Sequence, residues 1–490
     1  MISLASLDRW KYLVAVWMPA LIQFGSILLF TRLFDADAYG QFTLAVAAAG
    51  LWSGLMMQWL TQAIQRYRPA YRTAGALQPF DAHLTSLLLR LLLATAAGAG
   101  AVYALSLLWF EGYGLWFGWT LLLGISQGLY MVMSIILNAD RQADAYRSYQ
   151  LTQALLRLGL ALLIIYGIAF HVGGLIWGMA ISYVVLLPFM MRRTGLLRSR
   201  TIRATEGYHA FQRQMLAYGM PMAVWFAAGT VLDLGDRFLL AWLSDHAAVG
   251  IYGAYYSLIS AAIGFVAFPL LAAATPVLMQ FVHEPEQTEE AISKLNRHLS
   301  RPFLLMAIPC CSYLTLFHVE LGNLLFAPGY AEGAVVIPPL ALGFFLWHFS
   351  MYGHKGLEIR ERTLAMAGYA GTAAVTGVLA NIWLIPDCGY YGAALSTLIG
   401  FGVYALLIYV DARRPGRISW LIPWRTLTVS VVLSVLLAGA FYYFNVYWLT
   451  DTSPWLVMAV EGVVGAVLYG AACLGLGELR WPSRLKRSRR

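Results

Sequence analysis

The sequence of 490 residues is 60% hydrophobic and only 12% charged. Soluble globular domains carry about 25% charged residues, so this composition excludes a soluble protein and predicts an all-α polytopic membrane protein. The formal net charge of +9 does not indicate nucleic-acid binding. The basic residues lie beside membrane spans, where they set orientation and attract anionic membrane lipids.

Fourteen apolar stretches are long enough to cross the hydrocarbon core, which requires about 20 residues. We expect the first to be a retained signal anchor, because no small-residue cleavage site follows it. In chain order the stretches cover residues 12–31, 41–63, 84–109, 113–137, 150–170, 173–191, 215–242, 249–280, 302–325, 333–353, 364–385, 389–410, 425–448 and 454–476.

The connections on one side of these stretches contain 29 of the 33 Lys and Arg residues. Short cytoplasmic loops retain Lys and Arg, so this pattern predicts an even number of spans with both termini in the cytoplasm. The loops on the opposite side are only about ten residues long or shorter. An enzyme acting on outer-leaflet sugars would need a larger loop to carry its site, so we do not expect an enzyme.

Three short motifs occur twice, in the same order, in the two halves of the chain. From this repeat we predict an N-lobe at residues 1–203 with helices 1–6 and a C-lobe at 204–415 with helices 7–12. Residues 416–490 would add helices 13–14 and a basic cytoplasmic tail. We expect the lobes to enclose a central cavity, with the last two helices outside it. The paired motifs are Met18-Pro19 with Met220-Pro221, Tyr39-Gly40 with Val249-Gly250, and Gly178–Ser182 with Gly392–Ser396.

Between the lobes, Tyr208, Phe211 and Met215 follow at helical spacing beside basic residues. This pattern predicts an interfacial amphipathic helix over residues 203–218.

No phosphate-binding loop, metal-ligand spacing or pair of catalytic acids occurs in the sequence. We therefore expect no cofactor, no metal centre and no ATP-driven pump, so uphill transport would use an ion gradient or consumption of the product. The four cysteines are scattered along the chain, and their expected role is packing.

Two arginines lie inside apolar stretches, where an ionisable side chain is costly unless it faces a cavity or a partner. Arg90 lies near the cytoplasmic end of the third stretch, and Arg157 lies at a similar depth in the fifth. One interpretation is that both side chains extend to the lipid headgroups. The other is that both face an inward-opening cavity and bind an anion, such as the diphosphate of a lipid carrier, through the planar guanidinium.

The seventh stretch contains Asp233 and Arg237, which are four residues apart and share a helical face. They could form a solvated ion pair near the outer surface. Asp236 has no such intrahelical partner, so it is the better candidate to contact substrate, an ion or another helix. Arg237, together with Arg32 at the outer end of the first stretch, could receive the anion on the outer side.

Several motifs resemble the polysaccharide repeat-unit flippases of the multidrug/oligosaccharidyl-lipid/polysaccharide exporter superfamily. The resemblance covers about residues 10–412, and the two additional spans resemble those of lipid II flippases and some longer exopolysaccharide exporters. The motifs are Thr31–Phe42, Tyr218-Gly-Met-Pro221, Asp236-Arg237-Phe238-Leu239-Leu240, Val249-Gly-Ile-Tyr252, Leu325–Tyr330 and Asn381–Pro386, followed by Gly389 and Gly392-Ala-Ala394.

The resemblance implies a multi-pass protein of the bacterial inner membrane. It would move an undecaprenyl-diphosphate-linked oligosaccharide to the outer leaflet by alternating access, with a polysaccharide polymerase and glycosyltransferases as partners. By analogy with lipid II flippases, a Na⁺ or H⁺ coupling site would involve Asp233 or Asp236, Asn381, and Ser396 or Thr397. The alternatives are a multidrug or lipid II exporter of the same superfamily and, in a different class, a membrane-embedded polysaccharide polymerase or ligase.

Overall fold

The computed structural model describes residues 3–109, 114–168, 170–196, 207–279, 289–447 and 453–478. Every regular element in these residues is a helix, which confirms the all-α fold. The elements are α1 (Ser3–Leu33), α2 (Ala36–Thr73), α3 (Leu77–Trp109), α4 (Gly114–Ala139), α5 (Ala143–Gly167), α6 (Gly173–Arg193), α7 (Tyr208–Leu243), α8 (His246–Met279), α9 (Glu289–Leu316), α10 (His318–Leu325), the 3₁₀ helix η2 (Pro328–Val336), α11 (Ile337–Ile359), α12 (Thr363–Asp411), α13 (Trp424–Tyr447) and α14 (Pro454–Gly475).

The described part of each predicted span is largely helical, but the boundaries differ in three places. The predicted ninth span is divided between α9 and α10, and the predicted tenth begins within η2. The predicted eleventh and twelfth spans join in α12, which is interrupted at Gly389 by a backbone conformation of φ 52° and ψ −133°. Glycine adopts a positive φ without steric cost, so the chain can turn here without a longer loop. Among the described residues, eleven helices are long and apolar enough to cross a membrane, or twelve if the two parts of α7 count as one span. The chain is thus a multi-pass membrane protein, and fourteen spans remain a prediction.

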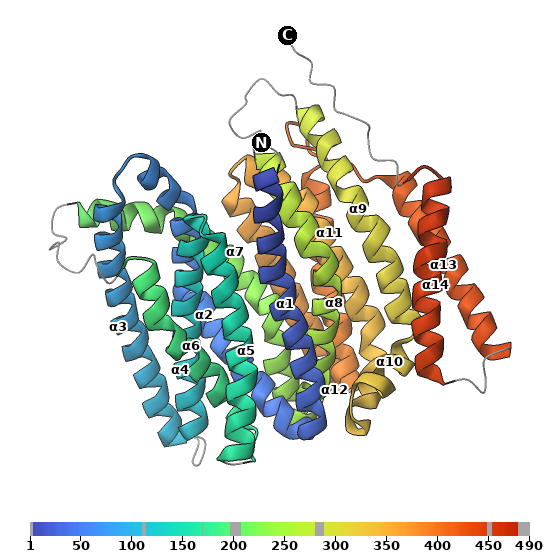
Figure 1. Cartoon of the computed structure of the whole chain (residues 1–490), viewed down its shortest axis with the longest axis horizontal. Helices are drawn as coiled ribbons and strands as arrows, with labels where there is room; N and C mark the ends of the chain where they lie inside the picture. Colours follow the sequence, from blue (N-terminus) through green and yellow to red (C-terminus); the bar gives the residue numbers. More distant parts are fainter. Residues whose placement is uncertain are drawn as a thin grey trace, which may run out of the picture.

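The helices form one bundle with two hydrophobic cores (Figure 1). The first core joins α2, α3, α4 and α6, and the second joins α7 to α12 with parts of α1 and α5. Between the cores, α2 contacts α7 and α8, while α1 contacts α8. The last two helices lie at one edge of the bundle, where α13 packs on α9.

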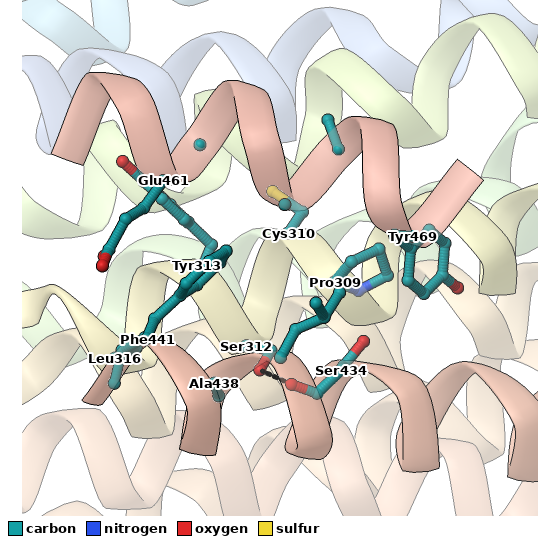
Figure 2. A pocket seen from close by; sticks show the side chains of 14 residues that line it. Pro309, Cys310, Ser312, Tyr313, Leu316, Ser434, Ala438, Phe441, Glu461 and Tyr469 are labelled. Atoms are coloured by element: carbon teal, nitrogen blue, oxygen red, sulfur yellow. Dashed lines mark hydrogen bonds between the residues drawn. The ribbon is translucent and has the colours of Figure 1, made fainter. Parts of the chain in front are cut away.

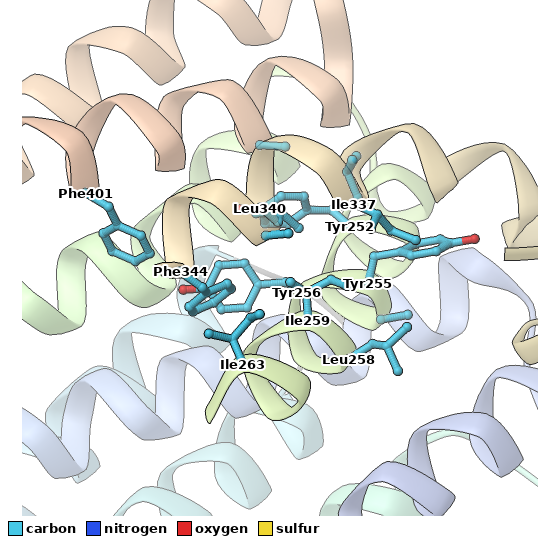
Figure 3. Close-up of a cluster of buried hydrophobic side chains, with 14 of the residues drawn as sticks. Tyr252, Tyr255, Tyr256, Leu258, Ile259, Ile263, Ile337, Leu340, Phe344 and Phe401 are labelled. Carbon is cyan, nitrogen blue, oxygen red and sulfur yellow. The ribbon is translucent and has the colours of Figure 1, made fainter. Parts of the chain in front are cut away.

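The second core surrounds α8, whose inward face is apolar and aromatic (Figure 3). Tyr252, Tyr255, Ile259 and Ile263 on this face are all 0% exposed. They are spaced three or four residues apart, so they lie on one side of the helix. This face orients the two neighbouring tyrosines, Tyr252 and Tyr256, toward the polar groups of α7 described below.

The first segment of α7 departs from the predicted interfacial helix. Tyr208, Phe211 and Met215 are buried, and the rings of Phe211 and Phe80 of α3 lie 5.3 Å apart. The segment 208–220 meets the rest of α7 at an angle of 40°. Its apolar face therefore covers protein rather than lipid, because α3 offers a hydrophobic surface that the sequence pattern cannot reveal. The part of this prediction before residue 207 lies outside the described residues.

Two glycines bring the first turns of α2 and α8 into backbone contact. A Cβ atom on Gly40 would lie 1.8 Å from the carbonyl oxygen of His246, and one on Gly250 would lie 1.9 Å from that of Ala36. Small residues allow membrane helices to approach in this way. The repeated Gly motif of the two halves is thus the point at which the halves meet.

Candidate functional site: a cavity between the halves

A cavity of about 370 Å³ lies between the two halves of the bundle. One wall comes from α1, α2, α5 and α6, and the other comes from α7 and α8. Among the described residues, α13 and α14 contribute nothing to its lining. Both features match the expected central cavity. The polar and charged lining residues are Gln23, Ser26, Tyr39, Thr43, Arg157, Asp233, Arg237, Tyr256, Ser257 and Ser260.

Arg157 faces this cavity from α5 and is only partly buried. Within the described part of the chain, its guanidinium has no hydrogen-bond or carboxylate partner. A cation at membrane depth is stable when it faces a polar cavity, and an unpaired guanidinium can bind a phosphate through two parallel hydrogen bonds. Arg157 is therefore free to bind an anionic group that enters the cavity.

Arg68, unlike Arg157, is fully buried and paired with acidic residues. The side chain of Arg68 on α2 is 2% exposed and contacts two carboxylates, Asp81 of α3 and Asp140 after α4, the latter at 2.8 Å. Its charge is fully compensated, and it connects the end of α2 to the start of α3 and the end of α4. Arg68 is thus structural, and this contrast distinguishes Arg157 as an arginine available for a ligand.

Arg237 lines the opposite wall of the cavity and is fixed by its own helix. It donates to the backbone carbonyl of Asp233 and to Oδ1 of Asp236, the second at 3.3 Å, and its guanidinium lies 4.3 Å from the ring centroid of Tyr256. The Tyr256 hydroxyl donates to the Asp233 carboxylate. In place of the Asp233–Arg237 ion pair considered from the sequence, the buried Arg237 bonds to the carboxylate of Asp236 and to the backbone carbonyl of Asp233, whose side chain is exposed. Because Asp236 and Asp233 hold Arg237, Arg157 is the lining arginine that has no acidic partner among the described residues.

Asp236 faces away from this cavity into a second, small polar site. Its carboxylate is 2% exposed and accepts hydrogen bonds from Tyr252 and, at 3.3 Å, from Thr397. A cavity of about 10 Å³ lies here, about enough to hold one water molecule. It is lined by apolar residues and by Asp236, Asn381, Ser396 and Thr397. The Asn381 Oδ1 atom is buried without a partner among the described residues. A carboxylate, an amide oxygen and two hydroxyls are donors that suit a small hard cation.

The structure separates the two aspartates that the sequence left as alternatives. Asp236 lies with Asn381 and Ser396, whereas Asp233 bonds to Tyr256 on the side of the central cavity. Two tyrosines of α8 bond to different acids: Tyr252 donates to Asp236, and Tyr256 donates to Asp233. The sequence did not identify these tyrosines as partners of the acids. Tyr252 and Tyr256 are four residues apart and therefore share one face of α8, as Asp233 and Asp236 share one face of α7.

Arg90 and Arg32 do not join the cavity. Arg90 is exposed, and its guanidinium lies 4.4 Å from the ring centroid of Tyr208. Arg32 is exposed at the outer end of α1 and donates to the carbonyl of Leu324 at 3.3 Å. The expected pairing of Arg90 with Arg157, and of Arg32 with Arg237, is not present. Arg90 is thus not part of the lining of the central cavity.

Different contacts join the helices at the two ends of α2. Near its first turn, the Tyr330 hydroxyl donates to the carbonyls of Phe34 and Asp35 at 3.0 and 2.9 Å, beside the Gly40–Gly250 crossing. Near its last turns, at the end that the charge pattern predicts to be cytoplasmic, Arg66 and Glu361 form an ion pair of 3.1 Å, with side chains 41% and 59% exposed. An exposed ion pair contributes only about 0–1 kcal/mol, so it is the weaker of the two contacts.

A separate, mostly hydrophobic groove of about 380 Å³ lies between α9, α13 and α14, outside the central cavity (Figure 2). Its wall is hollowed by Ala438, Gly462 and Gly465. Glu461 lines the groove, is 5% exposed, and accepts a hydrogen bond from Asn445 at 3.3 Å. Among the described residues all four cysteines are free thiols; Cys310 lines this groove, Cys473 is buried, and Cys388 is exposed, so the expected packing role does not apply to Cys388.

Solved structures define the class of protein to which this fold belongs. The lipid II flippase MurJ in an inward closed conformation matches with a TM-score of 0.75 and 13% identity, over 95% of this chain and 98% of that chain. An inward-facing multidrug resistance MATE family transporter of the MOP superfamily matches with a TM-score of 0.64 and 15% identity, over 89% and 98%. The Vibrio cholerae MATE transporter VcmN matches with a TM-score of 0.58 and 12% identity, over 82% and 94%. The class is a multi-pass membrane protein with the fold of these flippases and transporters.

The family model for polysaccharide biosynthesis proteins matches residues 9–282, which is more than half of the chain. The chain belongs to this family, which confirms the resemblance to polysaccharide flippases. A curated relative, the uncharacterized membrane protein MJ1068 of Methanocaldococcus jannaschii, is 24% identical over 272 residues. That alignment covers 55% of this chain and 51% of the relative, so the chain spans about half the length of the curated relative it matches.

Proposed function

We propose that this protein is a flippase that moves undecaprenyl-diphosphate-linked oligosaccharide repeat units across the bacterial inner membrane for cell-surface polysaccharide synthesis. The observation that carries the proposal is Arg157, a guanidinium without a carboxylate partner in a cavity between two lobes. A diphosphate is the part common to all such lipid carriers, whatever the sugar. Glycosyltransferases would supply this substrate, and a polysaccharide polymerase would consume the product.

The polar lining of the cavity supports a glycosylated substrate. Gln23, Ser257 and Ser260 add an amide and two hydroxyls to the arginines. These groups can exchange hydrogen bonds with sugar hydroxyls, while Tyr39 and Tyr256 present aromatic rings against which sugars pack. A multidrug exporter, the alternative within the superfamily, would favour acidic and aromatic lining over arginine. The unpaired guanidinium of Arg157 favours the diphosphate.

Transport would proceed by alternating access, with the cytoplasmic end opening first. The Arg66–Glu361 pair is exposed, whereas the outer closure is a buried backbone contact, so less free energy is needed to open the cytoplasmic side. Substrate would then enter from the inner leaflet, and the outer contacts would separate only after the cytoplasmic end had closed again.

Reversing the charge of Glu361 tests this order of opening. Glu361→Arg places two cations together and should increase labelling of a cysteine introduced into the cytoplasmic half of the cavity by about two- to fivefold, as expected for losing up to about 1 kcal/mol. The double exchange Arg66→Glu with Glu361→Arg should restore wild-type labelling. Unchanged labelling in the single variant would show that this pair does not close the cytoplasmic end.

Coupling to a cation gradient would use the small site at Asp236, Asn381, Ser396 and Thr397. We expect Na⁺ to raise the thermal unfolding midpoint of the purified protein relative to K⁺, because a cation that binds only the folded state stabilises it. Asp236→Asn should remove this increase, since it removes the one carboxylate of the site. Asp233→Asn, which is close in sequence but lies on the central cavity, is the matched control and should retain it. Transport that is unaffected by both Na⁺ and pH gradients would exclude coupling at this site.

Accumulation of the lipid-linked substrate in cells distinguishes the proposed function from its alternatives. Cells that lack the protein should accumulate lipid-linked oligosaccharide on the cytoplasmic leaflet. Loss of a polymerase or ligase would instead cause accumulation on the outer leaflet, and loss of a multidrug exporter would cause neither. Outer-leaflet accumulation, or an unchanged lipid pool, would contradict the proposal.

A further inference from the structure

We infer that a basic pocket on the cytoplasmic side, where α9, α13 and the end of α14 meet, binds the phosphate of an anionic membrane lipid. The pocket has a volume of about 360 Å³ and is separate from the central cavity and from the groove of Figure 2. It is lined by Lys294, Arg297, His298, Arg301, Pro423, Arg425, Thr426 and Glu478. This inference does not depend on the identity of the transported substrate.

A buried carboxylate fixes the floor of this basic pocket. The side chain of Glu478 is 1% exposed and contacts Arg301 at 2.6 Å and Arg425 at 3.1 Å, while the Thr426 hydroxyl donates to it at 2.6 Å. Burial raises the pKa of the Glu478 carboxyl, but the hydrogen bonds from Thr426 and Arg301 and the charges of Arg301 and Arg425 outweigh burial and lower it below its ordinary value. The carboxylate is therefore ionised and orients two guanidiniums before any ligand binds.

The pocket keeps a positive charge after these internal contacts are counted. Its four Lys and Arg side chains face two carboxylates, Glu478 and the Glu290 partner of Lys294, which leaves an excess of two positive charges. Among the described residues, Arg297 and His298 have no acidic partner. A phosphate bound between them and the fixed Arg301 and Arg425 would complete the hydrogen bonding of the pocket.

The position of the pocket favours a lipid as the source of the phosphate. α13 begins at Trp424, directly before Arg425, and the Trp424 side chain is 57% exposed. At the facing end of α14, Leu474 and Leu476 are 61% and 47% exposed. Tryptophan concentrates at the depth of lipid headgroups, and basic pockets between membrane helices on the cytoplasmic side bind anionic headgroups. The acyl chains would then lie along the exposed apolar residues.

The test measures thermal unfolding of the purified full-length protein in detergent, with added phosphatidylglycerol, phosphatidylcholine or inorganic pyrophosphate. We expect phosphatidylglycerol to raise the unfolding midpoint of the wild-type protein more than phosphatidylcholine does. In Arg297→Gln, the phosphatidylglycerol concentration that gives half of the maximal increase should be about fivefold higher than in the wild type. The double variant Arg297→Gln with His298→Gln should lose most of the effect. Both variants leave the partners of Glu478 unchanged, so the fold should be retained.

Two arginines at the cytoplasmic end of α6 provide the matched control. Arg192 and Arg193 are exposed and remote from the pocket, so Arg192→Gln with Arg193→Gln should retain the full response to phosphatidylglycerol. An equal response in the pocket variant and in the wild type would overturn the inference, as would an equal response to both lipids. If pyrophosphate alone reproduced the whole increase, the phosphate site would stand and its occupant would be a soluble phosphate compound.

Discussion

Replacement of Arg157 by alanine is expected to abolish transport of lipid-linked oligosaccharide without reducing the amount of folded protein. A hydrogen bond between a charged donor and phosphate is worth about 1.5–3 kcal/mol, which corresponds to roughly 10- to 150-fold in affinity. Arg157→Lys keeps the charge but loses the planar fork, so we expect a partial loss. Because Arg157 has no protein partner among the described residues, its removal leaves no buried carboxylate uncompensated. Initial transport rates and detergent-extracted yield are the measurements.

Arg90→Ala is the matched control for this variant. Arg90 is also an intramembrane arginine of the first lobe, but it is exposed and lies over Tyr208 rather than in the cavity. We expect it to retain most of the transport activity. Loss of transport in Arg90→Ala together with normal transport in Arg157→Ala would contradict the assignment of the anion site.

Gly250→Ala is expected to reduce transport at least tenfold, because a methyl group cannot be placed where α2 and α8 cross. Its Cβ would lie 1.9 Å from the carbonyl oxygen of Ala36, and a backbone atom cannot move aside as a flexible side chain can. Overpacking of this kind costs about 1–3 kcal/mol, which would be imposed only on states with a closed outer end. A cysteine introduced into the outer half of the cavity should therefore react faster from the outside.

Two glycines without close neighbours provide the controls for the helix crossing. Gly25 on α1 and Gly229 on α7 have nothing within 4 Å of an added Cβ, so alanine at either position should leave transport unchanged. Gly40→Ala should behave like Gly250→Ala. If Gly250→Ala transported normally with unchanged outer labelling, the crossing would not be the outer closure.

The membrane helices could be predicted from the sequence, whereas the contacts of individual charged side chains could not. Apolar runs predicted the long helices, because the hydrocarbon core imposes a length and a polarity on each span independently, but they did not predict the short helix α10 or the 3₁₀ helix η2. Depth within a span could not determine function: Arg90 and Arg157 have equivalent sequence positions, yet only Arg157 faces the cavity. The difference arises from packing, since Tyr208 reaches Arg90 from a helix more than a hundred residues later. The choice between Asp233 and Asp236 likewise depended on tyrosines of α8.

Features that depend on several distant segments were not predicted. The basic pocket combines residues of α9, α13 and the segment after α14, and the cytoplasmic ion pair joins α2 to the turn before α12. In sequence, both appear as ordinary basic connections. Charge counting predicted that these connections lie on one side of the membrane, but it could not identify their partners, which depend on how the helices pack.

The most direct test of the proposed function is a transport measurement in proteoliposomes that contain the purified protein and a fluorescent undecaprenyl-diphosphate oligosaccharide. Movement between leaflets is followed by the fraction of label accessible to an added impermeant quencher. We predict that wild-type protein makes the inner-leaflet label accessible, that Arg157→Ala does not, and that an analogue with a neutral link in place of the diphosphate is not moved. Equal movement of the diphosphate and neutral lipids, or no movement with folded wild-type protein, would contradict the proposed function.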